Sequence, residues 1–310
     1  MSGHDNHHSV MLDEAIKALF VRENGKYADC TYGRGGHSRA ILSALGPEGV
    51  LLTLDSDLDA VRHAKKTFAN DSRVIVEHSA FSKIKKIVEK HNLTGLDGVL
   101  LDLGVSSPQL DNAERGFSFR LDGPLDMRLD RTAGKTAADW LQKASQKEIE
   151  EVLKNYGEER YFRRIARALV TERDKYELDS TGDLAEVVKK AIPTLEKNKH
   201  PATRVFQAIR IHINRELDEL TQCLQQIIGL MNSGGRLVII SFHSIEDRIV
   251  KNFFKSKAQG DYLPRKFPIK DTDIKRTIRV LGKPLKASAE EIFKNRRSRS
   301  ATMRVAEKMP

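Results

Sequence analysis

The chain has 310 residues, enough for one large domain or for a domain that carries an insertion. Hydrophobic residues make up 39% and charged residues 31%, a balance typical of globular proteins that argues against extensive disorder. No apolar run approaches the ~18 residues that a membrane span needs, and the polar N-terminus lacks the pattern of a signal peptide. The two cysteines have neither zinc-binding nor redox spacing, so we expect a reduced cytoplasmic protein without a metal site.

Positive charge is concentrated at one end of the chain. Residues 251–310, here called the basic segment, hold 17 Lys or Arg and 6 Asp or Glu, a balance of +11 against +10 for the whole chain. A basic surplus confined to one segment indicates a polyanionic partner such as RNA. The alternative is a solvated tail that only aids solubility, and no pattern of Tyr or Trp is interleaved with the charges as a stacking platform for bases.

The first hundred residues alternate short apolar runs with amphipathic segments. The runs at 26–32, 49–55, 73–78 and 96–104 predict β-strands, and the segments between them have the spacing of helices. Strands separated by helices imply right-handed crossovers, so we expect a doubly wound, mostly parallel sheet with helices on both faces.

The pattern changes in the second third of the chain. From about residue 110 to 215 no parallel strand is predicted, and the segment 204–231 has a long amphipathic pattern of helical character. A strand returns at 234–242, and a helix follows it. We therefore expect an α/β domain interrupted by helices.

Two domains follow from this change of pattern. Residues 1–110 and 215–310 are expected to form the cofactor-binding α/β domain, and residues 111–214 an inserted all-helical domain. An insertion beside the strand ends of an α/β enzyme usually shapes the substrate site, so we expect the helical domain to recognise the substrate.

A glycine-rich loop follows the first strand. Gly33, Gly35 and Gly36 permit a tight turn and bring backbone N–H groups close to a ligand, and the next helix directs its positive end to the same place. Asp55 ends the second strand, 22 positions after Gly33, in the range where an acidic side chain accepts hydrogen bonds from ribose hydroxyls. Loop and carboxylate together predict an adenosine-containing cofactor.

Two cofactors fit such a crevice. The dinucleotide pattern G-x-G-x-x-G, counted from Gly33, needs a glycine where this chain has Ser38, so S-adenosylmethionine is favoured over NAD. A NAD-dependent oxidoreductase is the alternative enzyme. Asp102 ends the fourth strand, where the transferable methyl group would lie, in an apolar run in which a carboxylate needs a partner.

The segment after the fourth strand gives the most specific indication of reaction type. An amino group on a base is a poor nucleophile because its lone pair is delocalised, so an enzyme must orient it with hydrogen-bond acceptors. Amino-methyltransferases use Ser, Asp or Asn followed by two prolines and an aromatic residue, and Ser107-Pro108-Gln109 is related, with Gln109 replacing the second proline. A simple Ser-Pro turn is the alternative. Neither Cys30 nor Cys223 is placed as the nucleophile that C5-cytosine methylation requires.

Two further features admit two interpretations each. His243, after the fifth strand, either contacts substrate or lies beside a helix cap formed by Ser244 and Asp247. The arginines of residues 115–130 either bind RNA phosphates or pair with acidic residues of the same chain.

Together these motifs resemble those of the bacterial 16S rRNA cytosine-N4 methyltransferases (the RsmH or MraW type) along nearly the whole chain. The matching segments are 7–16, 29–38, 54–57, 102–111, 115–130, 200–211, 234–251 and 295–308. The resemblance implies a Rossmann-like S-adenosylmethionine-dependent methyltransferase fold and N4-methylation of a cytidine in the decoding centre of 16S rRNA. It also implies the small ribosomal subunit as partner and no membrane, and leaves open whether the protein is a homodimer.

The resemblance also assigns residues. The implied cofactor contacts are Gly35, Gly36 and His37 at the loop, Asp55 at the ribose, Phe81 near the adenine, and Asp102 and Gln109 at the methionine end. The hydroxyl of Ser107 and the carbonyl of Pro108 are expected to accept the amino hydrogens of the base. Arg296 and Ser298 depart from the family pattern, which has Pro and Ala there, and make the tail more basic. A non-catalytic RNA-binding or ribosome-assembly factor is a third interpretation, which the basic segment fits and the cofactor loop does not.

Overall fold

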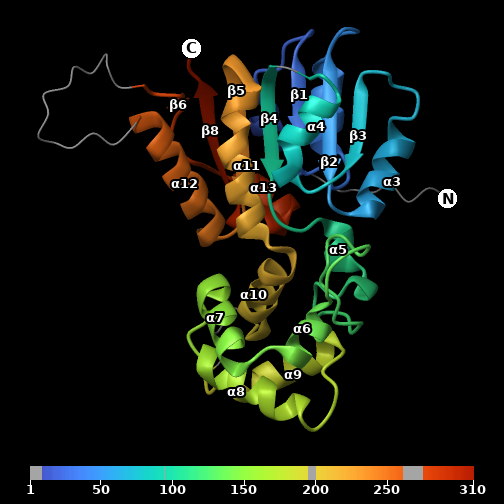
Figure 1. Ribbon diagram of the computed structural model, residues 1–310, viewed down its shortest axis with the longest axis vertical. Coiled ribbons are helices and arrows are strands. Elements are labelled where there is room, and N and C mark those ends of the chain that lie inside the picture. The colour runs from blue at the N-terminus through green and yellow to red at the C-terminus, as the bar shows by residue number, and fades with distance from the viewer. Residues whose placement is uncertain (1–8, 94, 195–199, 261–274) are drawn as a thin grey trace, which may run out of the picture. The chain divides into compact units, whose positions relative to one another are not determined.

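The protein is described here by a computed structural model, shown in Figure 1. It describes residues 9–93, 95–194, 200–260 and 275–310. The chain divides into two compact units, a sheet unit of Met1–Gly104 with Asp218–Pro310 and a helical unit of Val105–Leu217. The expected limits of the helical insertion, 111 and 214, lie inside the observed limits of the helical unit.

The two units differ in their elements. The sheet unit contains α1 (Leu12–Leu19), β1 (Lys26–Asp29), α2 (Gly36–Ala44), β2 (Val50–Asp55), α3 (Leu58–Thr67), β3 (Val74–His78), η1 (Phe81–Lys83), α4 (Ile84–Lys90), β4 (Leu96–Asp102), most of α11 (Glu216–Leu230), β5 (Met231–Ser241), α12 (Ser244–Gln259), β6 (Ile278–Val280), β7 (Leu285–Lys286), α13 (Ala289–Lys294), η4 (Arg296–Ser300) and β8 (Thr302–Lys308). The helical unit contains α5 (Ser107–Asp111), η2 (Ala113–Arg115), α6 (Ala137–Lys143), α7 (Gln146–Gly157), α8 (Phe162–Arg173), α9 (Thr181–Ala191) and α10 (Ala202–Asn214). None of the helices formed by the described residues combines the length and apolar character needed to cross a bilayer.

A single sheet organises the sheet unit. Its strand order is β3-β2-β1-β4-β5-β8-β6, with β7 paired to β8. Strands β1 to β5 are parallel, and β8 runs antiparallel to β5 and β6. The expected doubly wound, mostly parallel sheet is therefore confirmed, and all five predicted strands are present. The strand order reverses between β1 and β4, and ligands of such sheets bind beyond the carboxyl ends of the strands at that point.

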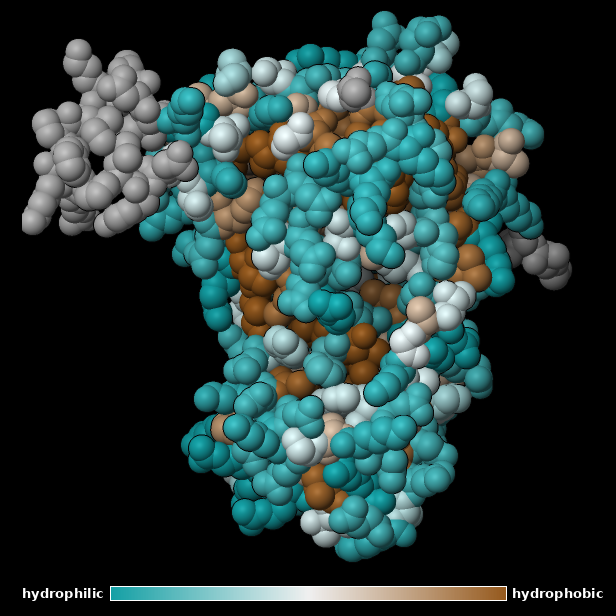
Figure 2. Space-filling view, viewed as in Figure 1, coloured by the Kyte–Doolittle hydropathy of each residue, from teal (hydrophilic) through white to brown (hydrophobic). Residues whose placement is uncertain are grey.

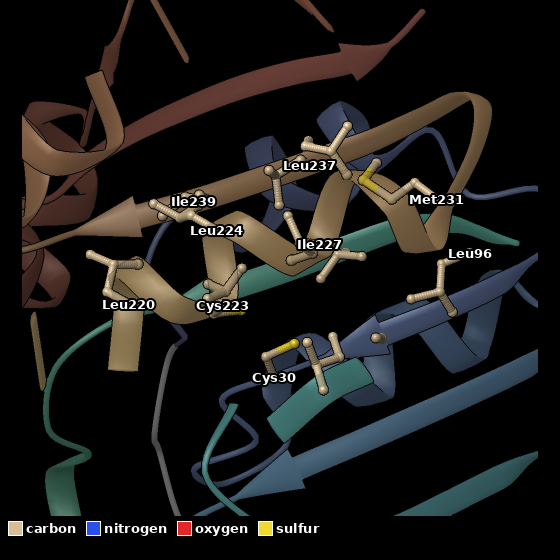
Figure 3. Packing of buried hydrophobic residues seen from close by; sticks show 14 of the residues in the cluster. Cys30, Leu96, Leu220, Cys223, Leu224, Ile227, Met231, Leu237 and Ile239 are labelled. Carbon is tan, nitrogen blue, oxygen red and sulfur yellow. The ribbon is translucent and has the colours of Figure 1, made fainter. Parts of the chain in front are cut away.

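Helices cover both faces of this sheet. On one face, Leu220, Leu224 and Ile227 of α11 pack against Leu237 and Ile239 of β5 (Figure 3). On the other face, buried side chains of α1, α2 and α3 form a second apolar cluster. Both faces of the strands are thus removed from water, as their continuous apolar runs predicted.

The two cysteines belong to the core. Cys30 and Cys223 are buried in the apolar cluster that α11 forms with the sheet (Figure 3). Burial raises the pKa of Cys30 well above its usual value and that of Cys223 to about 12, so neither thiol is a thiolate at neutral pH. Both thiols therefore have a packing role, in agreement with the expectation that neither is placed as a nucleophile.

The long amphipathic pattern over 204–231 forms two helices. The chain breaks at Arg215, which has a left-handed φ of 51°, between α10 and α11. The side-chain amide of Asn214 accepts a hydrogen bond from the N–H of Leu129 (2.7 Å) and donates one to the carbonyl of Met127 (2.8 Å). Each helix buries its apolar stripe in a different core, α10 in that of the helical unit and α11 in that of the sheet unit. In the amino-acid sequence, two apolar stripes that follow one another have the same periodicity as one continuous helix.

The described part of the basic segment is not a solvated tail. Its last strand, β8, lies between β5 and β6. The guanidinium of Arg304 donates to both oxygens of Asp247 (2.7 and 2.9 Å), and Arg236 and Arg279 both pair with Glu307 (2.7 and 2.6 Å). Part of the positive charge of the basic segment therefore stabilises β8 and β6, the strands at one side of the sheet. Residues 261–274 lie outside the described part of the chain.

The helical unit has its own core, formed by α6 to α10. Apart from one bridge between Pro124 and Ser180, its described residues contain no β-structure. Buried Arg115 donates to two backbone carbonyls, and Arg128 donates to both oxygens of Asp126 (2.7 and 3.0 Å). Both arginines therefore bind groups of the same chain, as one of the two interpretations of the arginines at 115–130 expected. On the face shown in Figure 2, hydrophilic residues dominate the surface of this unit.

The packing of α11 on the sheet predicts the cost of a cavity. Ile227→Ala removes a fully buried side chain between α11 and β5, and we expect unfolding in urea to require about 3 kcal/mol less free energy. Gln225→Ala, on the exposed side of the same helix, is the matched control and should change it by less than about 0.5 kcal/mol. Equal effects of the two substitutions would contradict this packing.

Candidate cofactor site

Three carboxylates end neighbouring strands of the sheet. Asp29 is the last residue of β1, Asp55 of β2 and Asp102 of β4. These strands are parallel and adjacent, in the order β2-β1-β4, so the three side chains lie at one edge of the sheet. This edge is the switch point where the strand order reverses, the usual ligand position in doubly wound sheets.

Backbone N–H groups hold Asp55. The N–H of Gly33 donates to Oδ2 and that of Asp57 to Oδ1, both at 2.8 Å. Burial raises the pKa of Asp55 to about 6, against the opposing effect of these two hydrogen bonds. Each carboxylate oxygen keeps a second lone pair, so the fixed side chain can still accept hydrogen bonds from a ligand.

The glycines of the loop permit close packing. Gly35 has a φ of 72°, and a Cβ on it would lie 2.5 Å from the ring of Tyr32. That ring is buried, and its hydroxyl is hydrogen-bonded to Nδ1 of His63 (2.8 Å). A Cβ on Gly36 would lie 1.9 Å from Oγ of Ser9. A side chain at Gly35 would displace the buried ring, and one at Gly36 would displace the side chain of Ser9. The loop leads directly into α2, whose first N–H groups have no acceptor within the helix.

Asp29 is a site residue that the sequence analysis missed. It is fully buried, with Oδ2 accepting from the hydroxyl of Ser38 (2.6 Å) and Oδ1 from the N–H of Thr31 (3.1 Å). Burial raises its pKa, and these two hydrogen bonds act in the opposite direction. A carboxylate at the end of an apolar strand was the signal that selected Asp102, and the same signal could have selected Asp29.

Asp102 is the least satisfied carboxylate of the three. Its Oδ1 is buried without a hydrogen-bond partner among the described residues, and Oδ2 lies 3.7 Å from Nδ1 of His37. Burial, followed by the negative charges of Asp29, Glu246 and Glu291, raises its pKa well above the usual value. An unpaired buried oxygen beside other carboxylates favours a cationic ligand group, which would supply both the hydrogen bond and the charge.

His37 joins the N-terminal segment to this edge. It is the second residue of α2 and is buried, and its Nε2 lies 3.1 Å from the carbonyl oxygen of Val10. Because a carbonyl can only accept, Nε2 donates and carries a proton. The ring is thus oriented with Nδ1 toward Asp102.

Phe81 lies beyond the end of β3. It begins η1, is half-buried and packs against the apolar cluster of the sheet unit. Two residues earlier, the N–H of Ser79 donates to the carbonyl of Asp55 (2.9 Å), which places this turn beside the end of β2. The structure therefore brings six expected cofactor residues to the same edge, namely Gly35, Gly36, His37, Asp55, Phe81 and Asp102.

The residues expected to act on the base lie in the helical unit. Ser107, Pro108 and Gln109 form the first turn of α5, and Ser106 is its N-cap. Oε1 of Gln109 accepts from the N–H of Ser106 (2.8 Å), and the carbonyl of Pro108 accepts from the N–H of Asn112 (3.0 Å). Gln109 therefore caps a helix, and the Pro108 carbonyl keeps one lone pair. Their roles toward cofactor and base stay predictions.

The cap of α12 differs from the alternative that paired Ser244 with Asp247. His243, and not Ser244, is the N-cap residue, and its partner is Glu246 instead of Asp247. The carboxylate of Glu246 accepts from the N–H groups of Phe242 (2.9 Å) and His243 (3.3 Å). Asp247 is instead paired with Arg304 of β8, a contact far away in sequence that a local motif cannot reveal.

Comparison with known proteins decides the family. The model of the MraW methylase family matches residues 4–309. The chain belongs to the MraW methylase family. It is 51% identical to "Ribosomal RNA small subunit methyltransferase H" of Thioalkalivibrio sulfidiphilus over 98% of this chain and 97% of that one. It is also 51% identical to the protein of the same name from Legionella pneumophila strain Paris, over 98% and 99% of the two chains.

Family membership confirms the expected resemblance and the expected enzyme class, a methyltransferase. Among solved structures, an rRNA methylase from Streptococcus thermophilus aligns with a TM-score of 0.42 and 9% identity, over 96% of this chain and 93% of that one. The fold is assigned from the strand order and not from this distant likeness.

The crowding around Gly35 predicts a steric effect. Gly35→Ala adds a Cβ against the buried Tyr32 ring at a left-handed φ, and we expect it to lower the free energy of unfolding by about 3 kcal/mol. Gly282→Ala is the control, because Gly282 has a similar φ of 68° with nothing within 4 Å of its added Cβ. Gly282→Ala should lower the free energy of unfolding by only about 1 kcal/mol. Equal losses in urea unfolding would show that Tyr32 does not restrict the loop.

Proposed function

We propose that the protein methylates N4 of a cytidine in the decoding centre of 16S rRNA. S-adenosylmethionine is the methyl donor. Membership in the MraW methylase family supports the reaction, and the printed name of its relatives supports small-subunit ribosomal RNA as the substrate. The observation that carries the proposal is the sheet edge where a glycine loop meets three carboxylates, one of which has a buried, unpaired oxygen.

The residues of this edge fit the cofactor. S-adenosylmethionine supplies a methyl group made electrophilic by a positively charged sulfur. Asp55 would accept hydrogen bonds from the ribose hydroxyls, and Oδ1 of Asp102 would accept one from the ammonium group of the methionine part. Phe81 would contact the adenine face.

The remaining cofactor contacts come from the loop and from α5. The turn that contains Gly35, Gly36 and His37 would let backbone N–H groups approach the methionine carboxylate, at the positive end of α2. Gln109 is assigned to the methionine end on the family resemblance. Its carboxamide oxygen caps α5, which fixes the position of the side chain.

The catalytic problem is the orientation of the amino group. Two acceptors, the Ser107 hydroxyl and the Pro108 carbonyl, would each take one amino hydrogen and direct the nitrogen lone pair toward the methyl carbon. The new C–N bond forms as the C–S bond breaks, the sulfur keeps the electron pair, and the nitrogen then releases one proton. No metal or covalent enzyme intermediate is required.

The helical unit is proposed to recognise the RNA, in the context of the small ribosomal subunit and therefore in the cytoplasm. The cytosine must be unpaired or turned out of its stack to reach the methyl group. Membership in a methylase family does not favour an NAD-dependent oxidoreductase or a non-catalytic assembly factor.

Methylation of small subunits tests the proposal. Subunits from a strain that lacks the gene are incubated with the protein and labelled S-adenosylmethionine, and we expect one N4-methylcytidine to be located by mass spectrometry. Ser107→Ala should lower kcat about 100-fold because one acceptor is lost, while the Kd for S-adenosylmethionine stays unchanged. Ser43→Ala, on the exposed side of α2, is the control. A label on another atom, or none, would refute the proposal.

The pH dependence of cofactor binding tests Asp55. Its pKa of about 6 means that the carboxylate takes up a proton as the pH falls below 6, and a protonated carboxyl accepts ribose hydroxyls poorly. We expect this group to weaken the affinity for S-adenosylmethionine about tenfold between pH 7.5 and pH 5. Asp55→Asn should bind weakly at every pH and lose this part of the dependence in calorimetry. The control Glu48→Gln, which removes an exposed carboxylate, should keep the wild-type profile.

A further inference from the structure

An exposed aromatic ring stands on α13 near the cofactor edge. Phe293 is 88% exposed, the highest value among the exposed large hydrophobic side chains of the described residues. The other five are between 42% and 62% exposed. A ring almost entirely in water contributes nothing to the core, and both of its faces are accessible to a ligand.

The chain next to this ring is rich in arginine. Arg296, Arg297 and Arg299 follow it on η4, and all three are exposed. Among the described residues, Arg296 and Arg299 form neither an ion pair nor a side-chain hydrogen bond, unlike Lys294, which pairs with Glu290 (2.6 Å). A flat apolar face beside free guanidinium groups is the combination that binds unpaired nucleotides, since bases stack on the ring and phosphates pair with the charges.

The turn that carries these arginines is held firmly. Oδ1 of Asn295 accepts from the N–H of Arg297 (3.1 Å), and the hydroxyl of Ser298 donates to the carbonyl of Asn295 (2.7 Å). Ser298 is fully buried, and η4 leads within two residues into β8. Ser298 stands where the family pattern has alanine, so here the small buried side chain also fastens the turn. A fixed turn lowers the entropy cost of binding.

α13 lies next to the cofactor edge within the sheet unit. Oε1 of Glu291 accepts from the N–H of Met11 (2.7 Å), and the preceding residue, Val10, accepts from Nε2 of His37. The charge of Glu291 also contributes to the raised pKa of Asp102. Figure 1 shows α13 at the end of the sheet toward which the arrow of β4 points.

We propose that α13 and η4 form a binding surface for single-stranded RNA next to the methylated cytidine, with one unpaired base stacked on Phe293 and phosphates on Arg296 and Arg299. This rests on the proposed function, which places the cytidine at the same edge of the sheet. The stacking ring of this surface is a single Phe. The basic segment can therefore bind RNA although no Tyr or Trp pattern is interleaved with its charges.

A second copy of the chain suits this surface less well. In a two-fold dimer the same patch meets itself, so Arg296 and Arg299 would face their own counterparts, and like charges repel. Exposure of the ring together with free positive charge therefore favours a polyanion over self-association.

Stacking is tested with a short fluorescein-labelled single-stranded RNA in anisotropy titrations. We expect Phe293→Ala to weaken binding about tenfold and Phe293→Trp to preserve it, because the indole also stacks. The control is Phe20→Ala, which removes a ring that is 62% exposed near the start of β1, where the hydroxyl of Tyr27 donates to the carbonyl of Phe20. It should leave the affinity unchanged. Equal affinity of Phe293→Ala and wild type would overturn the proposal.

Phosphate contacts are tested by salt. The double variant Arg296→Ala with Arg299→Ala should reduce the slope of log Kd against log salt by about 1.4, since each phosphate contact on a single strand contributes about 0.7. The double variant Lys65→Ala with Lys66→Ala removes the same charge from the exposed last turn of α3 and should keep the wild-type slope. Equal slopes for the two double variants would overturn the phosphate contacts.

Two measurements separate this proposal from the proposed function. Calorimetry should give Phe293→Ala the wild-type affinity for S-adenosylmethionine, and its KM for small subunits should rise. If the wild type bound RNA through Phe293 but methylated no cytidine, the proposed function would fail while the surface stood. If Phe293→Ala changed the sedimentation coefficient of the protein but not its RNA affinity, the ring would belong to a contact between copies, and the proposal would fail.

Discussion

Three carboxylates are removed from water at one edge of a parallel sheet, and the surrounding structure is arranged around that constraint. A buried carboxylate is costly unless hydrogen bonds or positive charge replace its hydration. Asp29 receives a hydroxyl and an N–H, and Asp55 receives two N–H groups. Gly33 of the glycine loop and Ser38 in the first turn of α2 supply two of these four donors. Asp102 alone keeps a buried oxygen without a partner, so the protein is incomplete where a cationic ligand group would bind.

The arginines of the basic segment are found in two kinds of environment. In the basic segment, Arg304 pairs with Asp247 and holds β8 against α12, whereas Arg296 and Arg299 stay in solvent on η4. Paired guanidinium groups stabilise the sheet edge, and unpaired ones are available to phosphate. Net charge indicates a polyanion but does not say which arginines meet it, because pairing depends on residues brought close only by folding.

Much of the site could be predicted because its elements are local. A strand, a glycine turn and a helix in succession place Gly35 and His37 correctly, and an acidic residue at a strand end places Asp55 and Asp102. Helix capping was less predictable. Ser244 with Asp247 and His243 with Glu246 are both plausible pairs by spacing, and the choice depended on Asp247 finding Arg304 in β8.

The sequence by itself determined the alternation of strands and helices, the parallel sheet and the edge at which a cofactor is expected to bind, because hydrophobic periodicity and turn residues act over a few positions. Only the tertiary structure decided that the long amphipathic stretch forms two helices that end and begin at Arg215, since each half packs into a different core. It alone placed β8 between β5 and β6, and it alone left Phe293 in solvent on α13. These outcomes depend on long-range pairing and burial, which no short window of sequence encodes.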